Sequence, residues 1–263
     1  MTCPSCQKDN QSGKFCGSCG TPLSAAATET AASYAAGPST QQTEVINRAK
    51  GASKQYGNYA LQLLKKPSEA FDKSDQQFVQ GLSTLVIYLV TFALSLFFLF
   101  NSLFKKAQSS FGSYMEGLAP ESLPFFKITW PLFLNTTFIV LAAVISTLAV
   151  ARIISASFSV KGLITQFGSL LVPFAALNVL GMLAGLAGSI KFTLILGSIS
   201  LLFPVLLYPA LIIYEYALKS EAPIKRVYWS LGATLFTVFL IYLEINLFIR
   251  DKVQEYERML NML

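Results

Sequence analysis

The sequence predicts an all-α membrane fold: a five-span transmembrane helical bundle that follows a small cysteine-rich domain. Three observations support this class. Hydrophobic residues make up 53% of the chain and charged residues 13%, whereas soluble globular domains contain about 25% charged residues. The apolar residues form unbroken runs after residue 80, and all four cysteines come before residue 20. We therefore expect five regions: a cysteine-rich domain at 1–20, a flexible linker at 21–42, amphipathic juxtamembrane helices at 43–80, the bundle at 81–250 and a C-terminal tail at 251–263.

The cysteine-rich domain is predicted to be a zinc ribbon. Its cysteines form two C-x-x-C pairs, CPSC and CGSC, separated by nine residues. Four thiolates at this spacing can surround Zn²⁺ tetrahedrally, and so short a segment needs the metal to supply its folding free energy. Two disulfides or a redox-active C-x-x-C are the alternatives, but no β-α-β pattern surrounds the pairs and no signal peptide is expected before them. We therefore predict one Zn²⁺ ion bound by Cys3, Cys6, Cys16 and Cys19.

The charges of the chain indicate which partners to expect. The ribbon carries only two lysines, Lys8 and Lys14, which are too few for the phosphate contacts that dominate nucleic-acid binding. No nucleic acid is expected, and a protein partner is predicted for the ribbon. The formal net charge of +6 is interpreted as contact with anionic membrane lipid. The alternative is that these charges simply keep the tail soluble.

A flexible tether and then an amphipathic helix are predicted before the first span. The tether is mainly Ala, Thr, Ser, Gln and Gly without periodicity, a composition typical of flexible linkers. Between Val45 and Leu63 apolar residues recur at helical spacing, with lysines and arginines on or near the other faces. This helix is expected either in the headgroup plane or against the cytoplasmic end of the bundle. Pro67 should end it, and a short helix should restart at Ser68.

Five segments are apolar enough to cross a membrane, which takes about 20 residues. The third and fourth are separated only by a short turn around Ile190–Phe192, so they should form a tight antiparallel hairpin unless one of them is re-entrant. Prolines at 173, 204 and 209 can kink these spans where neighbouring helices satisfy the freed backbone groups. The five predicted spans are Leu82–Phe104, Trp130–Ala151, Leu163–Ser189, Thr193–Tyr214 and Tyr228–Ile249.

The orientation of the bundle is predicted from the thiols. Lysines and arginines near the membrane are almost evenly divided between its two sides, so the positive-inside rule does not decide the matter. A zinc ribbon needs a reducing compartment. The N-terminus is therefore expected in the cytosol and, with an odd number of spans, the C-terminus outside the cell membrane.

Glu244 is the one ionisable residue expected inside a predicted span, about a turn from the end of the fifth. Such residues are candidates for a functional site, although a solvated carboxylate at the interface is the alternative. Glu215 is expected where the fourth span leaves the bilayer. Ion-coupled carriers usually contain several facing charges, which this sequence lacks. The polar neutral side chains within or near the spans are Asn135, Gln166 and Asn178.

The third span contains the motif GMLAGLAG, with small residues four positions apart at Gly181 and Gly185 and again at Ala184 and Gly188. Small residues at this spacing let two helix backbones approach closely. Packing within the bundle is the preferred interpretation. Formation of a homo-oligomer through this face is the alternative.

The motifs together resemble a family of bacterial membrane proteins in which an N-terminal zinc ribbon precedes a Yip-like bundle. The resemblance is carried by CPSC, CGSCG and KKPSEAF (Lys65–Phe71), followed by the five apolar segments. The chain departs from the common form at Gln7, where a glycine often follows the first pair. Eukaryotic Yip-type proteins act in membrane trafficking. For this chain the resemblance implies the architecture and says little about activity.

These features predict a non-enzymatic membrane scaffold or regulator whose cytosolic ribbon contacts a protein partner. The alternative is a small transporter, channel or accessory permease subunit. An enzyme acting on lipids is not expected, because the chain has no histidine and no nucleophile–base pair can be nominated.

Overall fold

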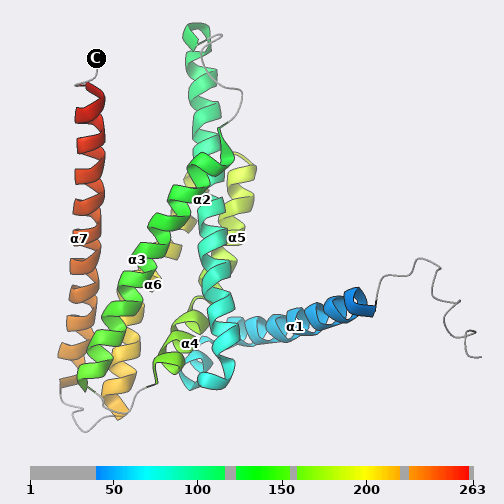
Figure 1. Ribbon diagram of the computed structural model, residues 1–263, viewed down its shortest axis with the longest axis vertical. Helices are drawn as coiled ribbons and strands as arrows, with labels where there is room; N and C mark the ends of the chain where they lie inside the picture. Colours follow the sequence, from blue (N-terminus) through cyan, green and yellow to red (C-terminus); the bar gives the residue numbers. More distant parts are fainter. Residues whose placement is uncertain (1–39, 116–122, 155–158, 220–224, 261–263) are drawn as a thin grey trace, which may run out of the picture. The chain divides into compact units, whose positions relative to one another are not determined.

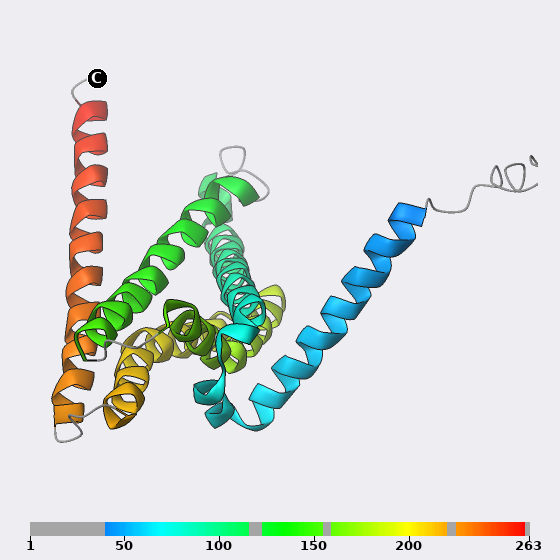
Figure 2. The same cartoon turned by 60° about the horizontal axis from the view of Figure 1, so that its bottom comes forward.

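The computed structural model describes residues 40–115, 123–154, 159–219 and 225–260. These residues form helices joined by short connections and include no β-strand. Figure 1 shows the helices and Figure 2 shows them turned by 60°. In chain order they are α1 (Thr40–Lys65), the 3-10 helices η3 (Pro67–Asp72) and η4 (Asp75–Gln77), then α2 (Phe78–Met115), α3 (Phe125–Ile154), α4 (Val160–Leu170), α5 (Val172–Leu186), α6 (Ile190–Lys219) and α7 (Arg226–Leu260).

Four helical segments in the described residues are long and apolar enough to cross a membrane, and a fifth is added if the bent pair α4–α5 counts as one span. The predicted all-α membrane fold is therefore confirmed, with four or five candidate spans. The four segments are Asp75–Ser110, Phe125–Ile154, Ile190–Leu218 and Arg226–Arg250.

The helix α1 is divided between two compact units, with the boundary between Gln55 and Tyr56. Within the second unit, the C-terminal part of α1 packs on the bundle. Tyr59 and Leu63 are buried, and the Tyr59 hydroxyl lies 2.6 Å from Oγ of Ser169 in α4. Burial raises the pKa of the Tyr59 hydroxyl above its usual value of 10.0, against the opposing effect of the hydrogen bond to Ser169. Of the two sequence-based alternatives for this helix, packing against the bundle thus applies from Tyr56 onward.

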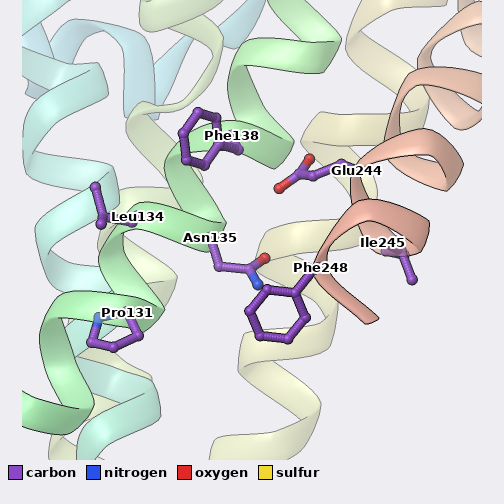
Figure 3. Close-up of a pocket in the computed structure, with 7 residues that line it drawn as sticks. All are labelled: Pro131, Leu134, Asn135, Phe138, Glu244, Ile245 and Phe248. Carbon is purple, nitrogen blue, oxygen red and sulfur yellow. The ribbon is translucent and has the colours of Figure 1, made fainter. Parts of the chain in front are cut away.

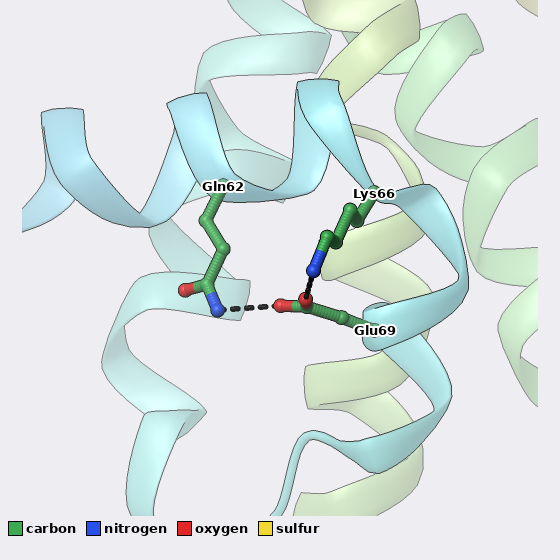
Figure 4. Close-up of polar contacts among 3 residues, drawn as sticks. All are labelled: Gln62, Lys66 and Glu69. Carbon is green, nitrogen blue, oxygen red and sulfur yellow. Dashed lines mark hydrogen bonds and ion pairs between the residues drawn. The ribbon is translucent and has the colours of Figure 1, made fainter.

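The predicted stop at Pro67 agrees with the structure, since α1 ends at Lys65 and η3 begins at Pro67 itself. Glu69 connects the two helices across this corner (Figure 4). It accepts a hydrogen bond from the amide of Gln62 and lies 3.6 Å from the ammonium of Lys66. At its other end, α1 begins at Thr40, inside the predicted linker.

Hydrogen bonds join α4 to the segment before α2. Ser159 caps α4 by accepting a hydrogen bond from the backbone N–H of Gly162, and its own hydroxyl donates to the carboxylate of Asp75 at 2.7 and 2.8 Å. A negative charge near a helix N-terminus is favourable because of the helix dipole. Gln166, farther along α4, donates to the backbone carbonyl of Phe71 at 3.0 Å.

A pair of glycines brings α2 and α4 into backbone contact. A Cβ atom added to Gly168 would lie 2.1 Å from the carbonyl oxygen of Gly81, and one added to Gly81 would lie 2.8 Å from Cα of Thr165. Real Cβ atoms do not approach other atoms this closely, so both positions require glycine. The hydropathy pattern gave no indication of this contact.

The glycines of the GMLAGLAG motif pack against α2. An added Cβ would lie 2.7 Å from Oγ of Ser95 at Gly181, and 2.9 Å from Cβ of Phe98 at Gly185. The hydroxyl of Ser102 also donates to the carbonyl of Gly185 at 2.7 Å. For Gly181 and Gly185 the preferred interpretation, packing within the bundle, is confirmed, whereas an added Cβ at Gly188 has no atom within 4 Å.

The predicted third span is broken. Instead of one helix over Leu163–Ser189, α4 ends at Leu170 and α5 begins at Val172, with a bend of 40° between them. Pro173, in the first turn of α5, lacks the N–H that would continue the helical hydrogen bonds. The hydroxyl of Tyr208 in α6 donates to the carbonyl of Leu170 at 2.5 Å, which satisfies an acceptor at the break.

The turn between α5 and α6 lies three residues before the predicted one. It comprises residues 187–189, and α6 already begins at Ile190. Gly188 has a φ of 76°, which glycine adopts without steric cost. Its N–H bonds to the carbonyl of Gly185, and the N–H of Ser189 bonds to that of Ala184. This pair of bonds is a Schellman motif, which ends the helix at the glycine.

A tyrosine of α2 compensates for a proline of α6. Pro204 lies inside α6 and cannot donate to the carbonyl four residues earlier, which belongs to Ser200. The hydroxyl of the fully buried Tyr88 donates to that carbonyl at 2.8 Å. The helix α6 can therefore continue through Pro204 without an unsatisfied acceptor in the membrane interior.

Candidate functional site

The four predicted zinc ligands, Cys3, Cys6, Cys16 and Cys19, lie outside the described residues. The zinc ribbon therefore stays a prediction. Within the ranges that the structure describes, no three acidic or cysteine side chains come together as a metal site would require.

A groove with a volume of ≈ 350 Å³ lies between α3 and α7 and contains Glu244. Its two polar side chains are Glu244 and Asn135 (Figure 3), and the rest of its lining is apolar. Figures 1 and 2 show α3 and α7 diverging toward the C-terminal end of α7. We call this feature the α3–α7 groove, and its lining consists of Pro131, Leu134, Asn135, Phe138, Glu244, Ile245 and Phe248.

The polar ends of Glu244 and Asn135 point into the space between the two helices (Figure 3). Both side chains are half-buried. Neither forms a hydrogen bond or an ion pair with any residue that the structure describes. The next amide along α7, Asn246, instead donates to the carbonyl of Tyr242 in its own helix. The groove therefore presents a carboxylate and an amide whose hydrogen-bonding capacity remains available.

The groove opens to the outer surface of the bundle. Phe138 and Phe248, which border it, are 56% and 51% exposed. In the most apolar stretch of the α7 span 11% of the residues are buried, compared with 44% in the spans of α2, α3 and α6. The helix α7 therefore contacts the bundle along a narrow face, and the surface beside the groove faces lipid in a membrane.

The sequence pattern indicated Glu244 as a candidate site residue but did not predict that Asn135 lies beside it. The depth of Glu244 and Asn135 in the membrane could by itself have suggested that they lie close together. Asn135 is five residues after Trp130, an interfacial residue by prediction, and Glu244 is five residues before the predicted end of its span at Ile249. Since α3 and α7 run in opposite directions, both residues come to the same level. What depth could not reveal is that they share one face of the helix pair.

Two of the other polar candidates, Asn178 and Gln166, form hydrogen bonds within the bundle. Asn178 is buried and its amide donates to the carbonyl of Tyr88 at 3.4 Å, while its Oδ1 has no partner among the described residues. Gln166 holds η3 onto α4, as described above. Glu215 lies half-buried near the C-terminal end of α6. These residues are distributed over the bundle and do not share a site with Glu244.

Comparison with known proteins identifies one relative along nearly the full length of the chain. The chain is 25% identical over 262 residues to YvbI of Bacillus subtilis (strain 168), a protein described as uncharacterized, and the match covers 97% of each chain. No family model matches the sequence. No solved structure matches it. The Yip-like resemblance therefore stays a prediction.

Proposed function

We propose that this protein is a non-enzymatic integral membrane scaffold or regulator whose N-terminal zinc ribbon contacts a protein partner. The observation that carries the proposal is the way the bundle uses its polar groups. Tyr88, Tyr208 and Ser102 bond to backbone carbonyls of neighbouring helices. These three contacts join neighbouring helices, while Glu244 lies in a groove on the outer surface.

The topology that we propose has five spans. Contacts with the pair α4–α5 begin at Gly81 and reach Ser102. The 21 residue steps from Gly81 to Ser102 correspond to about 31 Å of helix, which is close to the thickness of the hydrocarbon core. The pair also runs in the same direction as α2, since Gly81 meets Gly168 and Ser102 meets Gly185. Both facts indicate that the pair α4–α5 crosses the whole membrane as one bent span. They disfavour a re-entrant loop.

An odd number of spans separates the two termini. We propose a multi-pass protein of the cell membrane with the N-terminus in the cytosol, since free thiols require a reducing compartment. The C-terminus, beyond α7, is then external.

The ribbon would hold Zn²⁺ through Cys3, Cys6, Cys16 and Cys19. Four thiols in two C-x-x-C pairs fit a structural zinc site, whose metal supplies folding free energy rather than chemistry. Elemental analysis of the purified protein should find one zinc per chain, and Cys16→Ser should lower that content without reducing the amount of inserted bundle. A zinc-free preparation that contains oxidised thiols would contradict the site.

The function itself is tested by extraction in mild detergent together with reconstitution. We expect a cytosolic protein to copurify stoichiometrically with the wild type and to be lost with Cys16→Ser, and we expect no solute flux through liposomes that contain the purified protein. Absence of a partner together with specific flux would replace the scaffold with a transporter.

The second candidate function, a small transporter, channel or accessory permease subunit, is favoured by the broken helix α4–α5. Discontinuous spans form the binding sites of many transporters. Against it, the carbonyl at the break is occupied by Tyr208. The flux measurement distinguishes the two candidates.

A further inference from the structure

The structure assigns a partner to the α3–α7 groove: we propose that it receives a transmembrane helix of another membrane protein, through a lysine or arginine that pairs with Glu244 and Asn135. This inference rests on the proposed scaffold function and extends it from the cytosolic ribbon to the membrane. It is carried by the charge of the groove, the spacing of its lining and its depth.

Charge complementarity indicates a cationic occupant. A carboxylate inside a span is costly unless it is paired, and Glu244 has no counter-ion among the residues that the structure describes. Asn135 adds a carbonyl oxygen on the facing helix (Figure 3). A lysine ammonium carries three donors and an arginine guanidinium five, so either could bond to both oxygens at once.

The spacing of the lining indicates a helix. On α3 the lining residues Pro131, Leu134, Asn135 and Phe138 occupy positions i, i+3, i+4 and i+7, which is the spacing of a face that packs against another helix. On α7 Glu244 and Phe248 are one turn apart. The lining thus lies along two helices that diverge toward the C-terminal end of α7, with a furrow between them. The small buried share of the α7 span means that most of its surface is not covered by the described bundle.

Depth favours a helix-borne cation over a lipid headgroup. Glu244 lies six residues inside the span that ends at Arg250, or about 9 Å along the helix axis. An ammonium of a lipid headgroup stays at the membrane surface. A lysine carried by a neighbouring helix can instead lie at the same level as the carboxylate.

The test uses the full-length protein in liposomes and a synthetic transmembrane peptide of leucine and alanine with one lysine at the depth of Glu244. Energy transfer between labels on the protein and the peptide measures association. We expect the lysine peptide to associate about tenfold more tightly than the same peptide with leucine at that position. A peptide with glutamate there should not exceed the leucine peptide.

Variants of the protein identify the group responsible. Glu244→Gln should remove the preference for lysine while leaving the fold intact, because the carboxylate forms no hydrogen bond or ion pair with the residues that the structure describes. Glu244→Lys should reverse the preference, so that the glutamate peptide binds best. The matched control is Asn246→Leu on the same helix, whose amide bonds only within α7, and it should leave association unchanged.

Two results would overturn the inference. One is equal association of the lysine and leucine peptides with the wild type. The other is displacement of the peptide by a single-chain primary-amine amphiphile in a manner that depends on Glu244, which would make the groove a lipid site. Cys16→Ser should not affect peptide association. Absence of a cytosolic partner from the wild type, with retained peptide binding, would thus refute only the ribbon proposal, and specific solute flux would refute the scaffold but not the groove.

Discussion

At Gly168 a single added carbon atom would lie 2.1 Å from a backbone oxygen of the neighbouring helix. We therefore expect Gly168→Ala to lower the free energy of unfolding by about 1–3 kcal/mol, the usual cost of overpacking. The replacement Gly185→Leu should also lower the yield of folded protein, since Cβ would meet Phe98 at 2.9 Å. Unfolding in mixed detergent micelles provides the measurement.

Gly232 is the matched control for these two glycines, because an added Cβ has no atom within 4 Å there. Gly232→Ala should be neutral or stabilising, as alanine is favoured over glycine in helices. Equal destabilisation by Gly168→Ala and Gly232→Ala would mean that the close contact of α2 and α4 does not exist in the membrane.

At the scale of the helices, tyrosine hydroxyls from other helices bond to backbone carbonyls at a proline and at a helix break. Tyr88 reaches the carbonyl that Pro204 leaves without its helical donor, and Tyr208 reaches the carbonyl of Leu170 at the break near Pro173. The two tyrosines thus connect α2 with α6 and α6 with α4. The bend between α4 and α5 is therefore tied to α6 by a hydrogen bond.

We predict that Tyr88→Phe lowers the free energy of unfolding by about 1–2 kcal/mol, because it leaves the carbonyl of Ser200 unsatisfied in an apolar interior. The same change should cost less in a Pro204→Ala background, where the N–H of residue 204 can bond to that carbonyl. A double-mutant cycle measured by unfolding in detergent gives the coupling. Additive effects would show that the tyrosine does not compensate for the proline.

At the scale of the whole molecule, the number of crossings depends on whether the pair α4–α5 traverses the membrane. We expect single cysteines at Ser109 and Asn261 to react with an impermeant thiol reagent from outside intact cells, in a background without the ribbon cysteines. One at Ser39 should not react. Labelling at only one of the two outer positions would indicate an even number of spans, and labelling at Ser39 would reverse the orientation.

Much of the architecture could be predicted from local composition. A run of about 20 apolar residues is a membrane-spanning candidate wherever it occurs, so the predicted spans at Leu82–Phe104 and Trp130–Ala151 both lie within helices of the structure. The end of α1 before Pro67 was also predictable from local sequence, because a proline interrupts the hydrogen bonds of its own helix. The break at Leu171 was not, since a proline can bend, interrupt or leave a span continuous. Pro204 and Pro209 lie inside an unbroken α6.

What the sequence by itself determined is the class of the molecule: an all-helical membrane chain, with its candidate spans, its small-residue packing face and one ionisable residue inside a span. These properties depend on residues close together in the chain. Only the tertiary structure decided that Gly81 faces Gly168 and that Tyr88 bonds to the carbonyl left free by Pro204. It also decided that Asn135 and Glu244 line one groove. Each of these pairs joins helices far apart in sequence, and hydropathy carries no information on how apolar helices are rotated against one another. In a membrane, close packing and scarce polar contacts determine that rotation.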